Sequence, residues 1–172
     1  MAVVTPPRPL AETDDRDRFD CGRESMNQWF RRHAWANHVS GLSRTNVICD
    51  ASTAEIIGYV TLSAAQIERA MLPKPQQRNK PDPVPAFLLG QLAVHKIHHG
   101  RGRGHGRSLL LFALRTALEA SHEIGSFGVI THPIDDLARE FYRRWGFQDL
   151  PFDPRRAMIV RMVDLERSNI EQ

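Results

Sequence analysis

A short run of glycine and basic residues at positions 101–106, Arg-Gly-Arg-Gly-His-Gly, constrains the fold of this chain more than any other stretch. An apolar segment, Phe87 to Val94, precedes it, and a helical pattern of leucines and alanines begins at Leu109. The run therefore predicts a loop between a strand and a helix N-terminus. Backbone N–H groups there lack intrahelical acceptors, the helix dipole is positive, and glycine permits close approach. Such a loop favours an anion, most naturally phosphate.

Spacing distinguishes the phosphate-binding motifs that this loop could form. A Walker A loop needs a glycine five positions before Gly106, where the chain has Arg101, and a lysine where it has Arg107. The dinucleotide-binding pattern, with glycines at the first, third and sixth positions, fails in every register. The pattern that fits is R-x-x-G-x-G, formed by Arg101, Gly104 and Gly106 and followed by two leucines. A surface loop rich in glycine and arginine is the alternative interpretation.

Length and composition limit the class of protein. A chain of 172 residues, 41% hydrophobic and 25% charged, is typical of one globular domain, so we expect residues 1–172 to form a single domain. The sequence has no run of about 18 apolar residues and no apolar N-terminal segment, which predicts a cytoplasmic protein without a membrane span. The histidines near the glycine run and the two isolated cysteines lack metal-site spacing, so we expect no metal.

The charge of the chain suggests a polyanionic partner, although a solvated basic face would have the same composition. The formal net charge is +3. Arginines occur in three clusters: Arg101, Arg103 and Arg107; Arg139, Arg143 and Arg144; Arg155, Arg156 and Arg161.

Hydrophobic periodicity predicts a mixed α/β domain with the element order α-β-β-β-α-β-α-β. The first helix is expected to begin near Ser25, which has capping-box spacing to Gln28, and the turn after it to end at Gly41. Asp135 or Asp136 can cap a later helix. The other expected elements are strands at 46–49, 55–63, 87–94, 126–132 and 157–165 and a helix to about residue 121. The proline-rich stretch 72–85 predicts an extended, mobile loop.

The segment 137–147 has the pattern of a helix that ends at a glycine and leads into a strand. Tyr142 lies one turn after Ala138, whose small side chain leaves room beside the ring. Gly146 is placed to end the helix. The residues expected to face the core recur every four positions: Leu137, Phe141 and Trp145.

Together, R-x-x-G-x-G and the A-x-x-F-Y-x-x-x-G-F pattern at 138–147 resemble the GNAT acetyltransferases, which hold acetyl-CoA at the glycine motif. This resemblance implies the GNAT fold, a central mixed, mostly antiparallel twisted sheet flanked by helices. Shorter matches resemble the GNAT toxins of type II toxin–antitoxin systems: 19–22, 41–45, 57–60, the proline-rich loop, 89–94 and 153–156. Members of that family acetylate the α-amine of aminoacyl-tRNA, stop translation and pair with a ribbon-helix-helix antitoxin that binds DNA.

For this chain, the resemblance implies a toxin that uses acetyl-CoA as co-substrate. The expected partners are aminoacyl-tRNA, a ribbon-helix-helix antitoxin and a second copy of the chain, with DNA contacted only through the antitoxin. Tyr142 would protonate the departing thiolate, although a buried tyrosine with a structural hydrogen bond would look the same. The implied cofactor-binding residues are Leu92, Ala93, Val94, Arg101, Gly102, Arg103, Gly104, His105, Gly106, Arg107 and Phe141. Candidate substrate-binding residues are Arg44, Arg143 and Arg144.

One departure from the family pattern, the absence of an obvious general base and two competing functions accompany this interpretation. The segment between Val94 and Arg101 is about two residues longer than the family pattern, so residues 99–104 offer a competing register for the motif. No general base stands out, but a free α-amine titrates near ~7.7–8.0 and an aminoacyl ester lower still, so much of it is neutral without help. The alternatives are an acetyltransferase of a protein or small-molecule amine and a non-catalytic acyl-CoA-binding or nucleic-acid-binding module.

Overall fold

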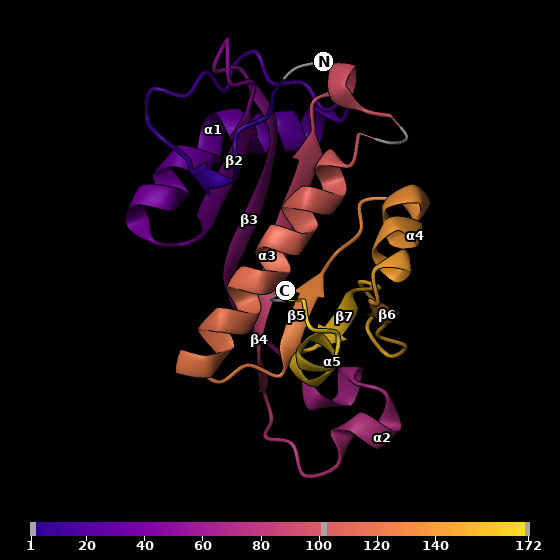
Figure 1. The fold of residues 1–172 in the computed structure, drawn as a ribbon. Coiled ribbons are helices and arrows are strands. Elements are labelled where there is room, and N and C mark those ends of the chain that lie inside the picture. Colours follow the sequence, from indigo (N-terminus) through magenta and orange to yellow (C-terminus); the bar gives the residue numbers. More distant parts are fainter. Residues whose placement is uncertain (1–2, 101–102, 171–172) are drawn as a thin grey trace. The chain divides into compact units, whose positions relative to one another are not determined.

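The computed structural model describes residues 3–100 and 103–170 (Figure 1). The strands are β1 Arg8–Pro9, β2 Arg44–Cys49, β3 Ile56–Ile67, β4 Val84–Val94, β5 Gly128–Thr131, β6 Gln148–Asp149 and β7 Met158–Arg161. The helices are α1 Glu24–Ser40, α2 Lys74–Gln77, α3 His105–Glu123, α4 Asp136–Arg144 and α5 Met162–Arg167, with 3-10 turns at Arg69–Met71 and Lys96–His98.

The strands of the described residues form one sheet in the order β1-β2-β3-β4-β5-β7-β6. β4 and β5 pair in parallel, whereas β1 with β2, β2 with β3, β5 with β7 and β6 with β7 pair antiparallel. The predicted mixed, mostly antiparallel α/β architecture is therefore confirmed. No helix within these residues has the length and apolar character needed to cross a membrane.

The chain divides into two compact units. The first comprises Met1–Ser63 and Gly90–Ala113, and the second comprises Ala64–Leu89 and Leu114–Gln172. β3, β4 and α3 each contribute residues to both units.

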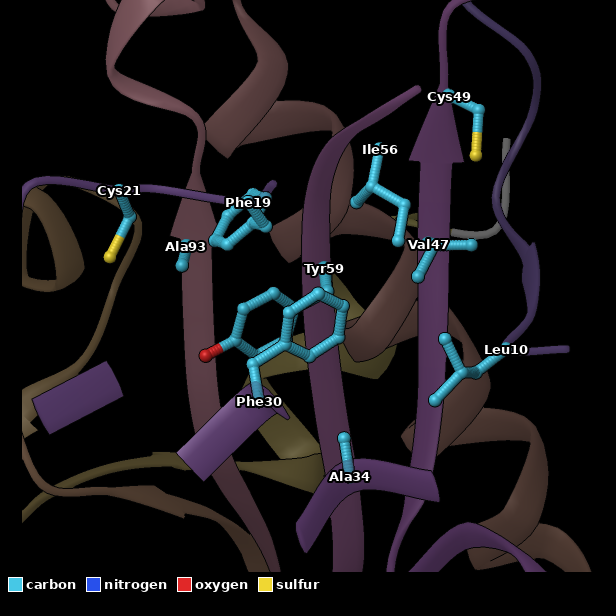
Figure 2. Packing of buried hydrophobic residues seen from close by; sticks show 10 residues of the cluster. All are labelled: Leu10, Phe19, Cys21, Phe30, Ala34, Val47, Cys49, Ile56, Tyr59 and Ala93. Atoms are coloured by element: carbon cyan, nitrogen blue, oxygen red, sulfur yellow. The ribbon is translucent and has the colours of Figure 1, made fainter. Parts of the chain in front are cut away.

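An aromatic cluster forms the core of the first unit, where α1 packs on β2 and β3 (Figure 2). The rings of Phe30 and Tyr59 stack with their centroids 4.1 Å apart, and the ring of Phe19 meets both edge-on. Val47 lies opposite Tyr59 in the antiparallel register, on the same buried face. Because these side chains come from α1, β2, β3 and the segment before α1, their packing joins the N-terminal third of the chain to the sheet.

Both ends of α1 lie where they were predicted, but the cap at its beginning differs from the prediction. The helix starts at Glu24 after an extended Arg23 that makes no side-chain cap, so the predicted capping box at Ser25 is wrong. Near this end of the helix, the side chain of Asn27 binds the preceding segment instead: its Oδ1 accepts a hydrogen bond from the Cys21 amide at 2.9 Å. Gly41 ends the helix with a left-handed φ of 79°, as expected.

The other face of the first unit carries the beginning of α3. A Cβ added to Gly58 on β3 would lie 2.8 Å from Leu109 Cδ1 and 2.9 Å from the Ala93 carbonyl oxygen. Real Cβ atoms essentially never approach this closely, so the absence of a side chain at Gly58 lets α3 lie close against β3 beside the end of β4.

The core of the second unit lies between the strands and the proline-rich stretch. This stretch was predicted to be an extended, mobile loop, but it contains the helical turn α2 and the first residues of β4. Leu72 and Val84, near its two ends, are buried in the same cluster as Ile130 and Ile159. Apolar residues between the prolines therefore anchor the stretch, and its composition alone concealed them.

The buried face of α4 is rotated from the predicted one, although Phe141 and Trp145 are partly buried as expected. Leu137, expected to face the core, is 78% exposed, whereas Arg139 and Tyr142 are only 8% and 6% exposed. Arg139 can be buried because its guanidinium donates to Asp149 Oδ1 at 2.6 Å and to the Arg156 carbonyl at 2.7 Å. Both ends of the helix agree with expectation, since Asp135 accepts a capping bond from the Ala138 amide and a glycine with positive φ follows the last turn.

The predicted final strand, 157–165, is shorter than expected. It ends at Arg161, and Met162 begins the short helix α5. The expected element order also lacked β1, α2 and β6, each of four residues or fewer, which are too short to show a periodicity.

Candidate active site

The glycine loop leads directly into α3, and the junction lies at Gly104. Gly104 has a positive φ of 69°, and its carbonyl accepts the Ser108 amide at 2.9 Å. This is an intrahelical bond of the first turn, so the amides of His105, Gly106 and Arg107 precede the first donating amide and have no acceptor within the helix. Three N–H groups thus lie at the positive end of a 19-residue helix, an arrangement that favours an anion. This geometry agrees with the register that uses Gly104 and Gly106; Arg101 and Gly102 lie outside the described residues.

Near this junction the arginine side chains are positively charged, whereas the histidine rings are neutral. Burial, and then neighbouring cationic groups that include Arg103, lower the pKa of His98 and of His105, so both rings are neutral at pH 7. Arg103 is exposed and donates from Nη1 to the Ile97 carbonyl at 3.0 Å, which holds it over its own loop. Arg107 is exposed on the first turn of α3.

The end of β4 carries the segment Leu92 to Val94, predicted to bind the acetyl carbonyl. The parallel register of β4 with β5 covers Phe87 to Leu89 and ends there. Within the first unit, the amide of Gln91 donates to Thr61 Oγ1 at 2.9 Å and the amide of His95 donates to the Ile57 carbonyl at 2.7 Å. These bonds fix the backbone on both sides of Leu92 to Val94, a requirement for a preorganised donor to an oxyanion.

Tyr142 lies within the second unit with its ring against the edges of Phe141 and Phe147, at centroid distances of 5.3 and 5.2 Å. Burial raises the pKa of its hydroxyl to about 12, and a hydrogen bond with Thr131 acts in the opposite direction. The hydroxyl is therefore protonated at pH 7 and can act as a donor. Thr131 in turn donates from Oγ1 to the Leu89 carbonyl at 3.0 Å. Sequence reasoning missed Thr131; its only signal was a single hydroxyl within an apolar strand.

The three arginines predicted to bind substrate differ in how far they are already engaged. Arg44 donates from Nη1 to the His38 carbonyl at 2.7 Å within the first unit. Arg143 makes ion pairs with Glu140 at 2.5 Å and Asp149 at 3.0 Å within the second. Arg144 is exposed and makes no hydrogen bond or ion pair with any residue that the structure describes.

No family model matches the chain, but individual proteins do. It is 35% identical over 160 residues to the tRNA-acetylating toxin of Mycobacterium tuberculosis, which covers 93% of this chain and 94% of that protein. Solved structures with the same fold include AtaT complexed with acetyl-methionyl-tRNAfMet, at 26% identity and a TM-score of 0.86, covering 96% of this chain and 99% of that one.

Two further structures show complexes of such proteins. One is a tyrosine-to-phenylalanine mutant of AtaT bound to the C-terminus of the antitoxin AtaR and acetyl-CoA, at 25% identity, a TM-score of 0.80, and coverage of 96% and 97%. The other is a KacTA–DNA complex, at 25% identity, a TM-score of 0.81, and coverage of 99% and 100%.

The sheet, the glycine loop at the start of α3 and these likenesses define a GNAT-class, acetyl-CoA-dependent N-acetyltransferase. Within that class, the extent of identity to the mycobacterial protein shows that the chain belongs to the family of tRNA-acetylating toxins.

Proposed function

We propose that this chain transfers the acetyl group of acetyl-CoA to the α-amine of aminoacyl-tRNA and so stops translation. The observation that carries the proposal is the 35% identity to a tRNA-acetylating toxin along 93% of the chain. The anion site at the start of α3 and the buried, protonated hydroxyl of Tyr142 supply two groups that the reaction needs.

The cofactor site that we propose is built from backbone at two places. The amides of His105, Gly106 and Arg107 bind the pyrophosphate together with the loop from Arg101 to Gly104, and Arg103 and Arg107 add positive charge. Backbone N–H of the segment Leu92 to Val94 donates to the acetyl carbonyl as it becomes anionic. Phe141, whose ring is partly buried within the second unit, is a further cofactor-binding residue of the proposal.

In the proposed reaction, the neutral α-amine attacks the thioester carbonyl, the C–N bond forms and the C–S bond breaks. The amine loses one proton to water, and the thiolate takes the hydroxyl proton of Tyr142, which is then replaced from solvent. The products are the N-acetylated aminoacyl-tRNA and CoA with a free thiol. No general base is required, because a substantial fraction of the α-amine of an aminoacyl ester is neutral near pH 7.

The partners follow from the same proposal. Phosphates of the tRNA contact Arg44, Arg143 and Arg144, among which the exposed Arg144 is the most available. We further propose a homodimer that is neutralised by a ribbon-helix-helix antitoxin, with DNA bound through the antitoxin, in the cytoplasm. The complexes of AtaT with an antitoxin peptide and of KacTA with DNA support the antitoxin and DNA assignments. That residues 1–172 are a single GNAT domain also stays a proposal.

The deciding experiment supplies purified protein with labelled acetyl-CoA and either charged or uncharged tRNA. We expect label only on charged tRNA, and mild ester hydrolysis should release it as the N-acetyl amino acid. Label on protein or on free amines, with charged tRNA unmodified, would favour the other acetyltransferase interpretation. Absence of any transfer would favour the non-catalytic module.

Tyr142→Phe tests the acid role within that function. The variant keeps the ring and its packing but lacks the proton, and general acids typically contribute ~100- to 10,000-fold. We expect kcat to fall within that range while calorimetry shows unchanged acetyl-CoA affinity. A variant with full activity would show that another group or water protonates the thiolate.

A further inference from the structure

The side-chain amide of Gln91 on β4 is hydrogen-bonded through its oxygen but not through its nitrogen. Its Oε1 accepts from the Tyr59 hydroxyl at 2.6 Å, and the backbone amide of the same residue donates to Thr61 Oγ1 at 2.9 Å. Tyr59 and Thr61 are buried on β3, whereas Gln91 is only partly buried. Within the described ranges 3–100 and 103–170, Gln91 Nε2 makes no hydrogen bond. The two N–H groups of a side chain that is already held in place can therefore bind a ligand.

The hydroxyl of Tyr59 determines which end of the Gln91 amide is held. A phenol has one hydrogen to donate. The Tyr59 oxygen lies 2.6 Å from Gln91 Oε1 but 3.2 Å from the Met26 carbonyl of α1, so the shorter contact takes the hydrogen. The ring of Tyr59 is 0% exposed and stacks on Phe30, with the hydroxyl pointing toward β4 (Figure 2). The aromatic core of the first unit thus fixes the orientation of the amide.

Gln91 comes directly before the segment Leu92 to Val94, the proposed donor to the acetyl carbonyl. Its side chain lies on the same face of the sheet as Tyr59 and Ala93, the face that α1 covers. The other face carries the beginning of α3, which lies close to β3 at Gly58. Because the proposed phosphate site belongs to α3, the cofactor reaches β4 from that face. The face with Gln91 is left for the attacking amine.

We propose that Gln91 orients the acceptor: its Nε2 donates to the ester carbonyl of the aminoacyl group and so directs the α-amine at the acetyl carbonyl. The inference rests on the proposed function and adds a residue to it. A neutral amine attacks with its lone pair, so an N–H donor must act on a different atom. The ester carbonyl is attached to the same α-carbon as the amine, and a hydrogen bond to it restricts the rotation that turns the lone pair away. Tyr59 is a positioning residue, because it acts through Gln91.

Uncharged tRNA is the matched ligand for a test of this proposal. It has the same phosphates as charged tRNA but lacks the aminoacyl ester, so its binding should not depend on Gln91. Gln91→Met removes the amide with little change in length, and Tyr59→Phe removes a hydroxyl but keeps the stacked ring. Gln66→Met, the same chemical change at an exposed position of β3, is the control.

The test measures kcat/KM with labelled acetyl-CoA and charged tRNA, the inhibition constant of uncharged tRNA, and the Kd for acetyl-CoA by calorimetry. Loss of one neutral hydrogen bond in Gln91→Met should lower kcat/KM for charged tRNA about three- to tenfold. The inhibition constant and the Kd should not change. Tyr59→Phe should lower kcat/KM by a smaller factor, and it should have no further effect in a Gln91→Met background.

Several results would overturn the proposal. Full kcat/KM in folded Gln91→Met would show that Nε2 does not contact the acceptor. Weaker binding of uncharged tRNA or of acetyl-CoA, in proportion to the loss of kcat/KM, would show that Gln91 only maintains the shape of the site. A Tyr59→Phe effect that persists in the Gln91→Met background would refute the positioning role of Tyr59. If Gln91→Met does not fold, Gln91→Leu takes its place in the same comparisons. A wild-type protein that leaves charged tRNA unmodified would refute the proposed function as well, whereas the other results refute this inference alone.

Discussion

At the scale of single residues, Arg139 shows how a charged side chain comes to lie on the buried face of a helix. Its guanidinium joins Asp149 Oδ1 and the Arg156 carbonyl, so α4 is tied to the turn and strand that follow it. Burial raises the pKa of Asp149, but hydrogen bonds from Arg143 and then Arg139 outweigh it, and that pKa lies below its usual range. The ion pair therefore contributes to stability only while the carboxylate is ionised.

This pair predicts a pH-dependent stability. A carboxyl whose pKa is lowered in the folded state stabilises the protein above the unfolded value of ~3.9 and loses that contribution as the pH falls through its folded value. Asp149→Asn should cost about 1 kcal/mol at pH 7, a figure reduced because Asp149 is half-exposed, and progressively less below pH ~4. Denaturant unfolding of the wild type and the variant, at pH 7 and below pH ~4, measures this difference in the free energy of unfolding. Glu140→Gln, which removes only an exposed partner of Arg143, is the control; a pH-independent Asp149→Asn deficit would contradict the argument.

At the scale of elements, the junction between the glycine loop and α3 predicts a charge-dependent loss of cofactor binding. A Cβ at Gly104 would meet no atom within 4 Å, and Asn and Asp both tolerate its left-handed φ. Gly104→Asp should therefore fold yet raise the Kd for acetyl-CoA by roughly tenfold or more through repulsion of the pyrophosphate. Gly104→Asn, nearly the same in shape, should raise it less. Calorimetry decides, and unchanged affinity in Gly104→Asp would refute an anion site here.

The ends of helices and turns could be predicted from neighbouring residues, whereas contacts with residues distant in the sequence could not. The turn at Gly104, the cap by Asp135 and the stop at Gly41 each depend on a few neighbouring residues, so the sequence indicates them directly. The orientation of α4 depends on Arg139 meeting groups 10 and 17 positions later, which no helical periodicity reveals. Burial of the proline-rich stretch was missed for the same reason.

The candidate site follows the same division. The residue types of the glycine loop and Tyr142 could be selected from their motifs, because each motif is continuous in the chain. Thr131 could not be selected, since its hydrogen bond to the Leu89 carbonyl forms only when the fold brings β5 beside β4. Arg143 was selected without the knowledge that Glu140 and Asp149 already bind it.

At the scale of the whole molecule, the net charge of +3 and the clustered arginines predict a strong salt dependence for one substrate only. Arginines that neutralise tRNA phosphates release counterions, so the KM for charged tRNA should rise steeply with salt, and that for acetyl-CoA much less. Arg144→Gln should raise the KM for charged tRNA and lower the slope of log KM against log salt by about 1. Arg115→Gln, the same charge change at an arginine held by the Ile170 carbonyl, is the control. Equal salt slopes for both substrates would argue against tRNA phosphate contacts.

The close packing around Gly58 limits which mutations the gene tolerates at this codon. Because a methyl group there would collide with Leu109 and the Ala93 carbonyl, codon 58 tolerates as little change as a codon for a reacting group. Bacteria forced to express this protein without the proposed antitoxin should survive through mutations at codon 58 as readily as at codon 142. Colony counts would be similar for survivors with mutations at codon 58 and at codon 142. An immunoblot would distinguish them, since only survivors with mutations at codon 142 keep a normal amount of folded protein. A growth assay alone therefore does not distinguish a loss of packing from a loss of catalysis.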